Sequence, residues 1–130
     1  IAVVPDGIPK SQLPAIPRPT GFDAITSDGK LLAVSNGTEV GMWHFPGGIL
    51  KARLTEHAAT VRSGKFSPND EVLASGDANG TVLLWRVSDG ALLRTLSEHK
   101  RKVNDIAFSS NGTRMATVDE GGSVVIWSIP

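Results

Sequence analysis

The sequence predicts an all-β fold built from three copies of one four-stranded unit. Three tryptophans, Trp43, Trp85 and Trp127, stand at a constant spacing of 42 residues, and each closes a short apolar run. His57 and His99 repeat the same interval. A fixed period of about 40–45 residues is typical of a chain that copies one supersecondary unit. Short apolar runs bounded by turn residues predict strands rather than helices.

The first 20 residues differ from the rest of the chain. Prolines at positions 5, 9, 14, 17 and 19 remove backbone donors and restrict φ, so this segment is expected to be extended or irregular. Residues 1–4, Ile-Ala-Val-Val, form the one short apolar run at its start. We interpret them as a lone strand with no unit in front of it.

The second and third units align without a gap. Residues 61–66 match 103–108, and residues 72–75 match 114–117, with a turn of Ser, Asn, Asp or Gly between the two runs of each unit. The tryptophan-ending runs follow as third strands, and residues 91–96 supply a fourth strand to the second unit. Each unit is therefore predicted as four strands of about five or six residues joined by tight turns.

The first unit is the least regular. One residue fewer separates Ala33 from Trp43 than separates Ala74 from Trp85. The missing residue is assigned to the turn around Asn36, where Asn-Gly favours a two-residue hairpin. No histidine precedes this unit at the expected spacing. The predicted boundaries are a proline-rich segment at 1–20, a first unit at 21–56, a second at 57–98, and a third at 99–130 that lacks its outermost strand.

Composition limits the class of function. The chain has 130 residues, 40% of them apolar, and its 13 basic residues balance its 13 acidic ones. A nucleic-acid or membrane binder needs a basic excess, so neither partner is expected. No run reaches the ~18–20 apolar residues that span a bilayer, and the start does not read as a signal peptide. The chain has no cysteine, which excludes thiolate metal sites and disulfides and fits an intracellular, cytoplasmic location.

The repeated pattern resembles a known family. His-x8-Phe-Ser-x-Asn-x3-[Leu/Met]-Ala-[Ser/Thr], followed by Val-x-[Leu/Ile]-Trp, is similar to the WD-repeat β-propeller, in which each repeat contributes one four-stranded blade. The resemblance covers about residues 21–130 and is strong for the second and third units and weaker for the first. Departures include the aspartate usual after tryptophan, which is replaced by His44, Arg86 and Ser128.

The resemblance implies a hydrogen-bonded tetrad of His, Ser or Thr, Asp and Trp inside a blade. In the second blade it implies His57, Ser75, Asn79 and Trp85, with Asn79 where Asp is usual. His57, Ser75 and Asp77 also have the residue types of a hydrolase triad. Because the tetrad already accounts for the first two, and the same positions recur in the third unit, no catalytic residue is predicted.

In the third blade the resemblance implies His99, Thr117 and Trp127. Gly121 stands at the acidic position there, and Asp119 is near enough to replace it. The first blade keeps only its tryptophan, so it is expected to depend on burial of its apolar faces. Histidines at equivalent places in adjacent blades lie too far apart to share an ion, so no metal is predicted.

The function implied by the family is a rigid, non-catalytic platform for protein–protein contact that needs no cofactor. Two alternatives stay open: a structural portion of a multidomain enzyme or signalling protein, and a phosphate or nucleic-acid reader that uses a basic loop. Arg62 is the expected anchor of a peptide, because arginine is enriched at binding hot spots. The predicted binding rim comprises Thr60, Arg62, Lys100, Arg101, Lys102 and Asn104.

Three blades are too few for a ring, since propellers have about four to eight. The chain also begins without an initiator methionine, and the third blade stops after its tryptophan strand. Two expectations follow. Either this is a piece of a longer propeller, or identical copies join into one, with six blades from two copies or nine from three. In the second case the strand at residues 1–4 is expected to close the ring between copies.

Overall fold

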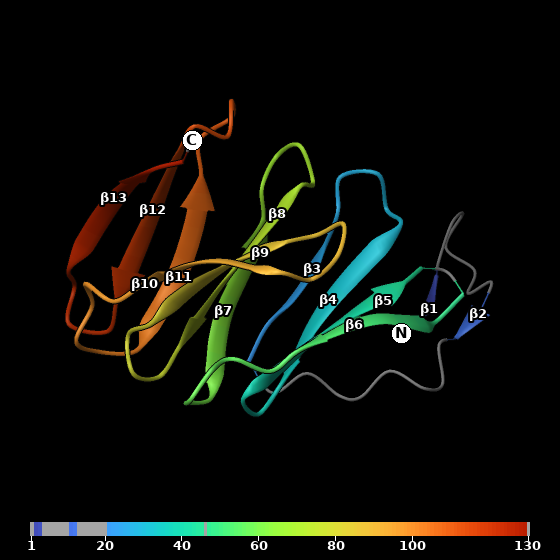
Figure 1. Cartoon of the computed structure of the whole chain (residues 1–130), viewed down its shortest axis with the longest axis horizontal. Helices are drawn as coiled ribbons and strands as arrows, with labels where there is room; N and C mark the ends of the chain where they lie inside the picture. The colour runs from blue at the N-terminus through green and yellow to red at the C-terminus, as the bar shows by residue number, and fades with distance from the viewer. Residues whose placement is uncertain (1, 4–10, 13–20, 46, 130) are drawn as a thin grey trace.

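The computed structural model describes residues 2–3, 11–12, 21–45 and 47–129, and its regular elements there are all strands (Figure 1). No helix in this part of the chain is long and apolar enough to cross a membrane. The prediction of an all-β fold is confirmed. Three antiparallel sheets, called blades 1, 2 and 3 below, account for eleven of the strands.

Each blade is a simple meander in which consecutive strands pair. Blade 1 has β3 (Asp23–Ile25), β4 (Leu31–Asn36), β5 (Glu39–His44) and β6 (Ile49–Leu54). Blade 2 has β7 (Val61–Phe66), β8 (Val72–Asp77), β9 (Val82–Arg86) and β10 (Leu92–Leu96). Blade 3 has β11 (Val103–Phe108), β12 (Arg114–Asp119) and β13 (Val124–Ser128).

The remaining pair of strands lies before blade 1. β1 (Ala2–Val3) pairs antiparallel with β2 (Ser11–Gln12) as a separate two-stranded sheet. The strand predicted at residues 1–4 thus has its central residues in β1, while Ile1 and Val4 lie outside the described residues. Within this chain β1 is therefore not a fourth strand of blade 3.

The blades stand side by side, with blade 2 between the other two (Figure 1). Their first strands, β3, β7 and β11, are neighbours. Polar contacts also join the blades: Ser27 in the β3–β4 turn donates to Asp70 in the β7–β8 turn through its backbone nitrogen, at 2.8 Å, and its hydroxyl, at 2.6 Å. The Ser63 hydroxyl donates to the Val103 carbonyl of blade 3, at 3.0 Å.

Both faces of blade 2 are apolar, because its strands alternate between two buried sides. One face, with Leu73, Leu83 and Trp85, packs on blade 1. The other face, with Ala74 and Leu84, packs on blade 3. A strand covered on both sides loses the polar alternation of a surface strand, which explains the continuous apolar run of β9.

The register of blade 1 shows where its repeat is one residue short. Leu32 pairs with Trp43, as Leu73 pairs with Trp85 and Met115 with Trp127. The shorter connection between these pairs in blade 1 is the β4–β5 hairpin. Counting from these pairs makes Val34, Ser75 and Thr117 equivalent, and likewise Asn36, Asp77 and Asp119.

We expect a methyl group at Gly76 to disturb the packing between blades 2 and 3. A Cβ at this position would lie 2.7 Å from the Val103 side chain and 2.8 Å from the Ser63 hydroxyl. Overpacking of this kind costs about 1–3 kcal/mol, so Gly76→Ala should lower the free energy of unfolding in urea by that amount. Gly47→Ala is the matched control, because a Cβ there would meet only Ile49 at 4.0 Å. Equal stability of the two variants would contradict this packing.

Candidate functional site

A chain of four buried side chains runs through blade 2. The Trp85 indole Nε1–H donates to the Ser75 hydroxyl at 2.8 Å, and that hydroxyl lies 2.6 Å from His57 Nε2. The other ring nitrogen, Nδ1, lies 2.9 Å from Asp77 Oδ2. With Nδ1–H donating to the carboxylate, Nε2 is left to accept from the serine. These hydrogen bonds hold the loop that carries His57 against β8 and β9.

Blade 3 contains the same series of hydrogen bonds. Trp127 Nε1 donates to the Thr117 hydroxyl at 2.9 Å, which lies 2.6 Å from His99 Nε2. His99 Nδ1 lies 2.9 Å from Asp119 Oδ2. The second oxygen of Asp119 accepts the backbone N–H of Ser123 at 3.0 Å, so the same carboxylate also holds the β12–β13 hairpin.

Burial and hydrogen bonding set the charge of these groups. Burial lowers the pKa of the His57 imidazole, although its contact with Asp77 acts in the opposite direction. The imidazole is therefore neutral at neutral pH, which leaves Nε2 able to accept the serine proton. Donation from His99 lowers the pKa of the Asp119 carboxyl, with backbone donors adding to the effect. That carboxylate is thus held in its charged form, the stronger acceptor.

The acid beside His57 is Asp77, and the prediction of Asn79 at this position is wrong. Ser75 and Asp77 are two residues apart on β8, so both side chains point to the same face and reach the same imidazole. Asn79 lies beyond the strand in the hairpin, where its backbone N–H donates to Asp77 Oδ1 at 2.9 Å. The acid of blade 3 is likewise Asp119 rather than a group at Gly121. Asp119 is the replacement expected from the sequence, and the two-residue spacing from the hydroxyl would also have identified Asp77.

The trio of His57, Ser75 and Asp77 cannot act as a hydrolase triad in this arrangement. Ser75 is 0% exposed, and its hydroxyl already lies between an indole and an imidazole. A nucleophile needs open space for the carbonyl that it attacks, together with donors for the oxyanion. Nor do the described residues contain a group of three or more histidine, acidic or cysteine side chains placed to hold a metal ion.

The predicted rim lies where the loops that carry His57 and His99 lead into β7 and β11, the first strands of blades 2 and 3. Arg62 in β7 and Asn104 in β11 occupy equivalent places, and both are exposed. At each, the register to the next strand shifts: Val61 pairs with Asp77 but Ser63 with Gly76, and blade 3 repeats this shift. Arg62 and Asn104 are the extra residues of two β-bulges, which commonly redirect a side chain out of a sheet.

Hydrogen bonds hold the backbone beneath this rim. The Ala78 N–H donates to the Thr60 carbonyl at 2.9 Å, and the Glu120 N–H donates to the Lys102 carbonyl at 2.8 Å. Each loop is thereby joined to the hairpin of its own blade. The side chains of Thr60 and Lys102 are partly buried, whereas those of Lys100 and Arg101 are exposed. The structure thus brings all the predicted rim residues to one edge of blades 2 and 3.

We expect loss of the central hydroxyl to destabilise blade 2. In Ser75→Ala the Trp85 indole N–H and His57 Nε2 both lose their partner in a buried place, which should cost about 2–4 kcal/mol in the free energy of unfolding. Ser75→Thr is the control, because Thr117 fills the equivalent position in blade 3. Thermal or urea unfolding measures both. A threonine variant as unstable as the alanine variant would show that the hydroxyl is not the stabilising group.

The lowered pKa of His57 predicts a loss of stability in mild acid. The unfolded chain binds a proton at a pKa near 6.5, whereas the folded chain binds it only at lower pH. The stability from neutral His57 is thus fully present above pH 6.5 and is lost as the pH falls below that value. Urea midpoints measured from pH 7.5 to 5 should decrease, and the decrease should be smaller in His57→Gln. An unchanged slope in that variant would contradict the assignment.

Comparison with known protein families identifies the one to which this chain is similar. The chain matches the family described as "WD domain, G-beta repeat" over residues 48–86 and 90–128, which together make up more than half of its length. No curated protein matches the chain. Each matched segment begins near the last strand of one blade and ends at the third strand of the next, so the sequence repeat bridges two sheets. The chain therefore belongs to the WD-repeat family.

Proposed function

We propose that this chain is a non-catalytic scaffold that binds an extended segment of another protein at the rim formed by Arg62, Asn104 and the Lys100–Lys102 loop. WD-repeat proteins in general act as platforms for protein–protein interaction. The observation that carries the finer proposal is the pair of β-bulges, because they set Arg62 and Asn104 out of the ladder at equivalent points of adjacent blades. Side chains placed in this way contribute to binding rather than to packing.

The charge of the rim favours an acidic peptide as partner. The cationic side chains of Arg62, Lys100 and Arg101 are exposed. Among the described residues none of the three forms an ion pair, whereas Arg53 and Arg86 pair with acids of their own blades. Unpaired cations at a rigid rim attract carboxylates and speed up their association. The balanced net charge of the chain disfavours nucleic acid at the same place.

A selected peptide provides the test. A random peptide library displayed on phage would be selected against the 130-residue chain, and the affinity of the recovered peptides measured for wild type and variants. Arg62→Ala should weaken binding at least tenfold, since arginine anchors commonly contribute that much. Melting temperature should stay near the wild-type value, because the side chain is exposed.

Arg94→Ala is the matched control, because Arg94 is an exposed arginine on β10, the outermost strand of blade 2. Its removal should leave peptide affinity unchanged. Peptides that bind both variants equally would rule out the rim as the site. Binding of a single-stranded oligonucleotide, measured separately, that falls steeply with salt and is lost in Arg62→Ala would favour a phosphate or nucleic-acid reader instead.

A further inference from the structure

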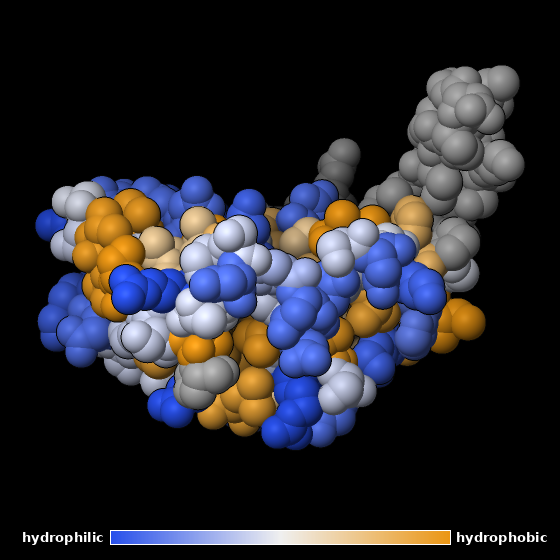
Figure 2. Space-filling view, turned by 90° about the horizontal axis from the view of Figure 1, so that it is seen from above, coloured by the Kyte–Doolittle hydropathy of each residue, from blue (hydrophilic) through white to orange (hydrophobic). Residues whose placement is uncertain are grey.

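Blade 3 exposes an apolar face that is covered in the other blades. Val124 and Ile126 are both 60% exposed. By register they are equivalent to Val82 and Leu84 of blade 2, which are 0% and 4% exposed and pack on blade 3. Figure 2 shows hydrophobic side chains gathered at the end of the molecule where blade 3 lies. We call Val124, Ile126 and Arg114, which lie on this face, the plug.

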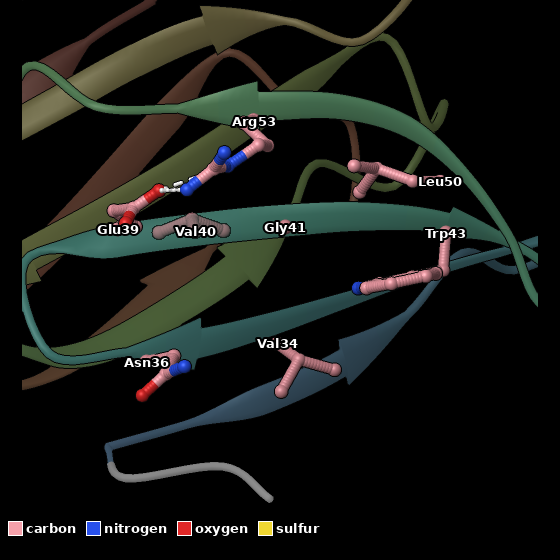
Figure 3. Close-up of a pocket in the computed structure, with 8 residues that line it drawn as sticks. All are labelled: Val34, Asn36, Glu39, Val40, Gly41, Trp43, Leu50 and Arg53. Atoms are coloured by element: carbon pink, nitrogen blue, oxygen red, sulfur yellow. Dashed lines mark hydrogen bonds and ion pairs between the residues drawn. The ribbon is translucent and has the colours of Figure 1, made fainter. Parts of the chain in front are cut away.

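Blade 1 carries the complementary face at the other end. Trp43 and Leu50 pair across β5 and β6, so they lie on the face equivalent to the Trp85 face of blade 2. They line a pocket of about 250 Å³ together with Val34 and Gly41 (Figure 3). Gly41 pairs with Val34 as Leu83 pairs with Ser75, so this face lacks the leucine of blade 2, and the Trp43 indole lies over Gly41 in its place. We call this hollowed face the socket.

Two interfaces within the polypeptide already show a face equivalent to the plug packed on a tryptophan face. Val40 and Met42 of blade 1, equivalent to the plug residues, pack on the tryptophan face of blade 2. The corresponding residues of blade 2 pack on the tryptophan face of blade 3. The plug of blade 3 thus continues a series of two interfaces within the chain, and the socket of blade 1 is the matching tryptophan face at the other end.

Charge also distinguishes the two ends. Asp23 pairs with Val34 and so lies on the socket face, at the place where blade 3 has Ile106. Arg114 pairs with Ser128 and so lies on the plug face, at the place where blade 2 has Val72. Both side chains are exposed, and neither has an ion-pair partner within the described part of the chain. The two end faces therefore carry opposite unpaired charges.

We propose that a second copy of this chain docks head to tail, with the plug of one copy seated in the socket of the other. Ile126 enters the pocket beside Trp43 and Leu50, and Arg114 approaches Asp23. Contacts of this heterologous kind form a ring when their rotation closes. Two copies supply six blades, within the range of about four to eight that propellers form, and so the expected product is a closed dimer.

The test uses two variants that each disable one end. Ile126→Glu places a charge on the plug, and Leu50→Glu places one in the socket, where Leu50 is 40% exposed. Light scattering behind a sizing column should give twice 13.7 kDa for the wild type and a single mass for each variant. An equimolar mixture of the variants should regain a 1:1 dimer, because one copy keeps its socket and the other its plug. Ile49→Glu, at a 67% exposed residue of the same strand, is the control and should remain dimeric.

Each outcome decides the proposal. A monomeric wild type would overturn it, as would dimers that persist in Ile126→Glu or variants that do not recombine on mixing. Recombination is the discriminating result, since a symmetric plug-to-plug contact would leave Leu50→Glu dimeric on its own and would form no dimer between the two variants. A wild type that grows into longer oligomers, but is capped at dimers in the mixture, would support head-to-tail docking and reject closure. Melting curves of the separate variants show whether each one is folded.

This inference adds a partner to the proposed scaffold and does not rest on peptide binding at the rim. The rim lies at the innermost strands of blades 2 and 3, whereas the plug and socket are the outward faces of the end blades. Failure of peptide selection with a normal dimer would reject the rim alone. Loss of the dimer in Ile126→Glu with unchanged peptide affinity would show the two surfaces to be separate.

Discussion

Face-to-face packing of apolar sheets is the constraint on which the rest of this structure depends. Each blade is too thin to bury its own apolar side chains, so its stability comes from the neighbour on either side. Blade 2 has two such neighbours, and its β9 is buried over four of five residues. Blade 3 has one, and β13 alternates between exposed and half-buried positions. Burial of these strands thus follows the number of neighbouring blades, although the repeated sequence is similar.

The polar chains inside blades 2 and 3 add order to this packing. Each runs from a tryptophan on the third strand through a hydroxyl and an imidazole to an aspartate at the end of the second strand. Because every buried side-chain polar atom in the described structure has a partner, these chains carry no desolvation penalty from an unpaired group. They also hold the histidine loops in place, and those loops form the proposed rim. The hydrogen-bonded residues that stabilise blades 2 and 3 therefore also hold the proposed binding surface in place.

Blade 1 shows what the packing achieves without such a chain. Val34 replaces the hydroxyl residue, Asn36 stands at the place of the aspartate, and Gly41 takes the place of Leu83. Its inner face still buries Val40 and Met42 completely against blade 2. Its outer face instead contains a pocket beside Trp43. The missing hydroxyl and carboxylate on that face agree with a blade that is held by its apolar contact, and that face is the one proposed for docking.

The sequence alone determined the strands of the three blades and the family, because a period of 42 residues and short apolar runs depend only on local patterns. It also supplied every member of the two hydrogen-bonded groups except Asp77, the acid of blade 2. Asp77 and Asn79 are both plausible by spacing, and only the strand boundary at Asp77 decides which carboxylate or amide faces the imidazole. The tertiary structure likewise decided which faces are covered. Val82 and Val124 have the same place in the repeat, yet one is 0% and the other 60% exposed, because burial depends on the neighbouring blade and not on the residue itself.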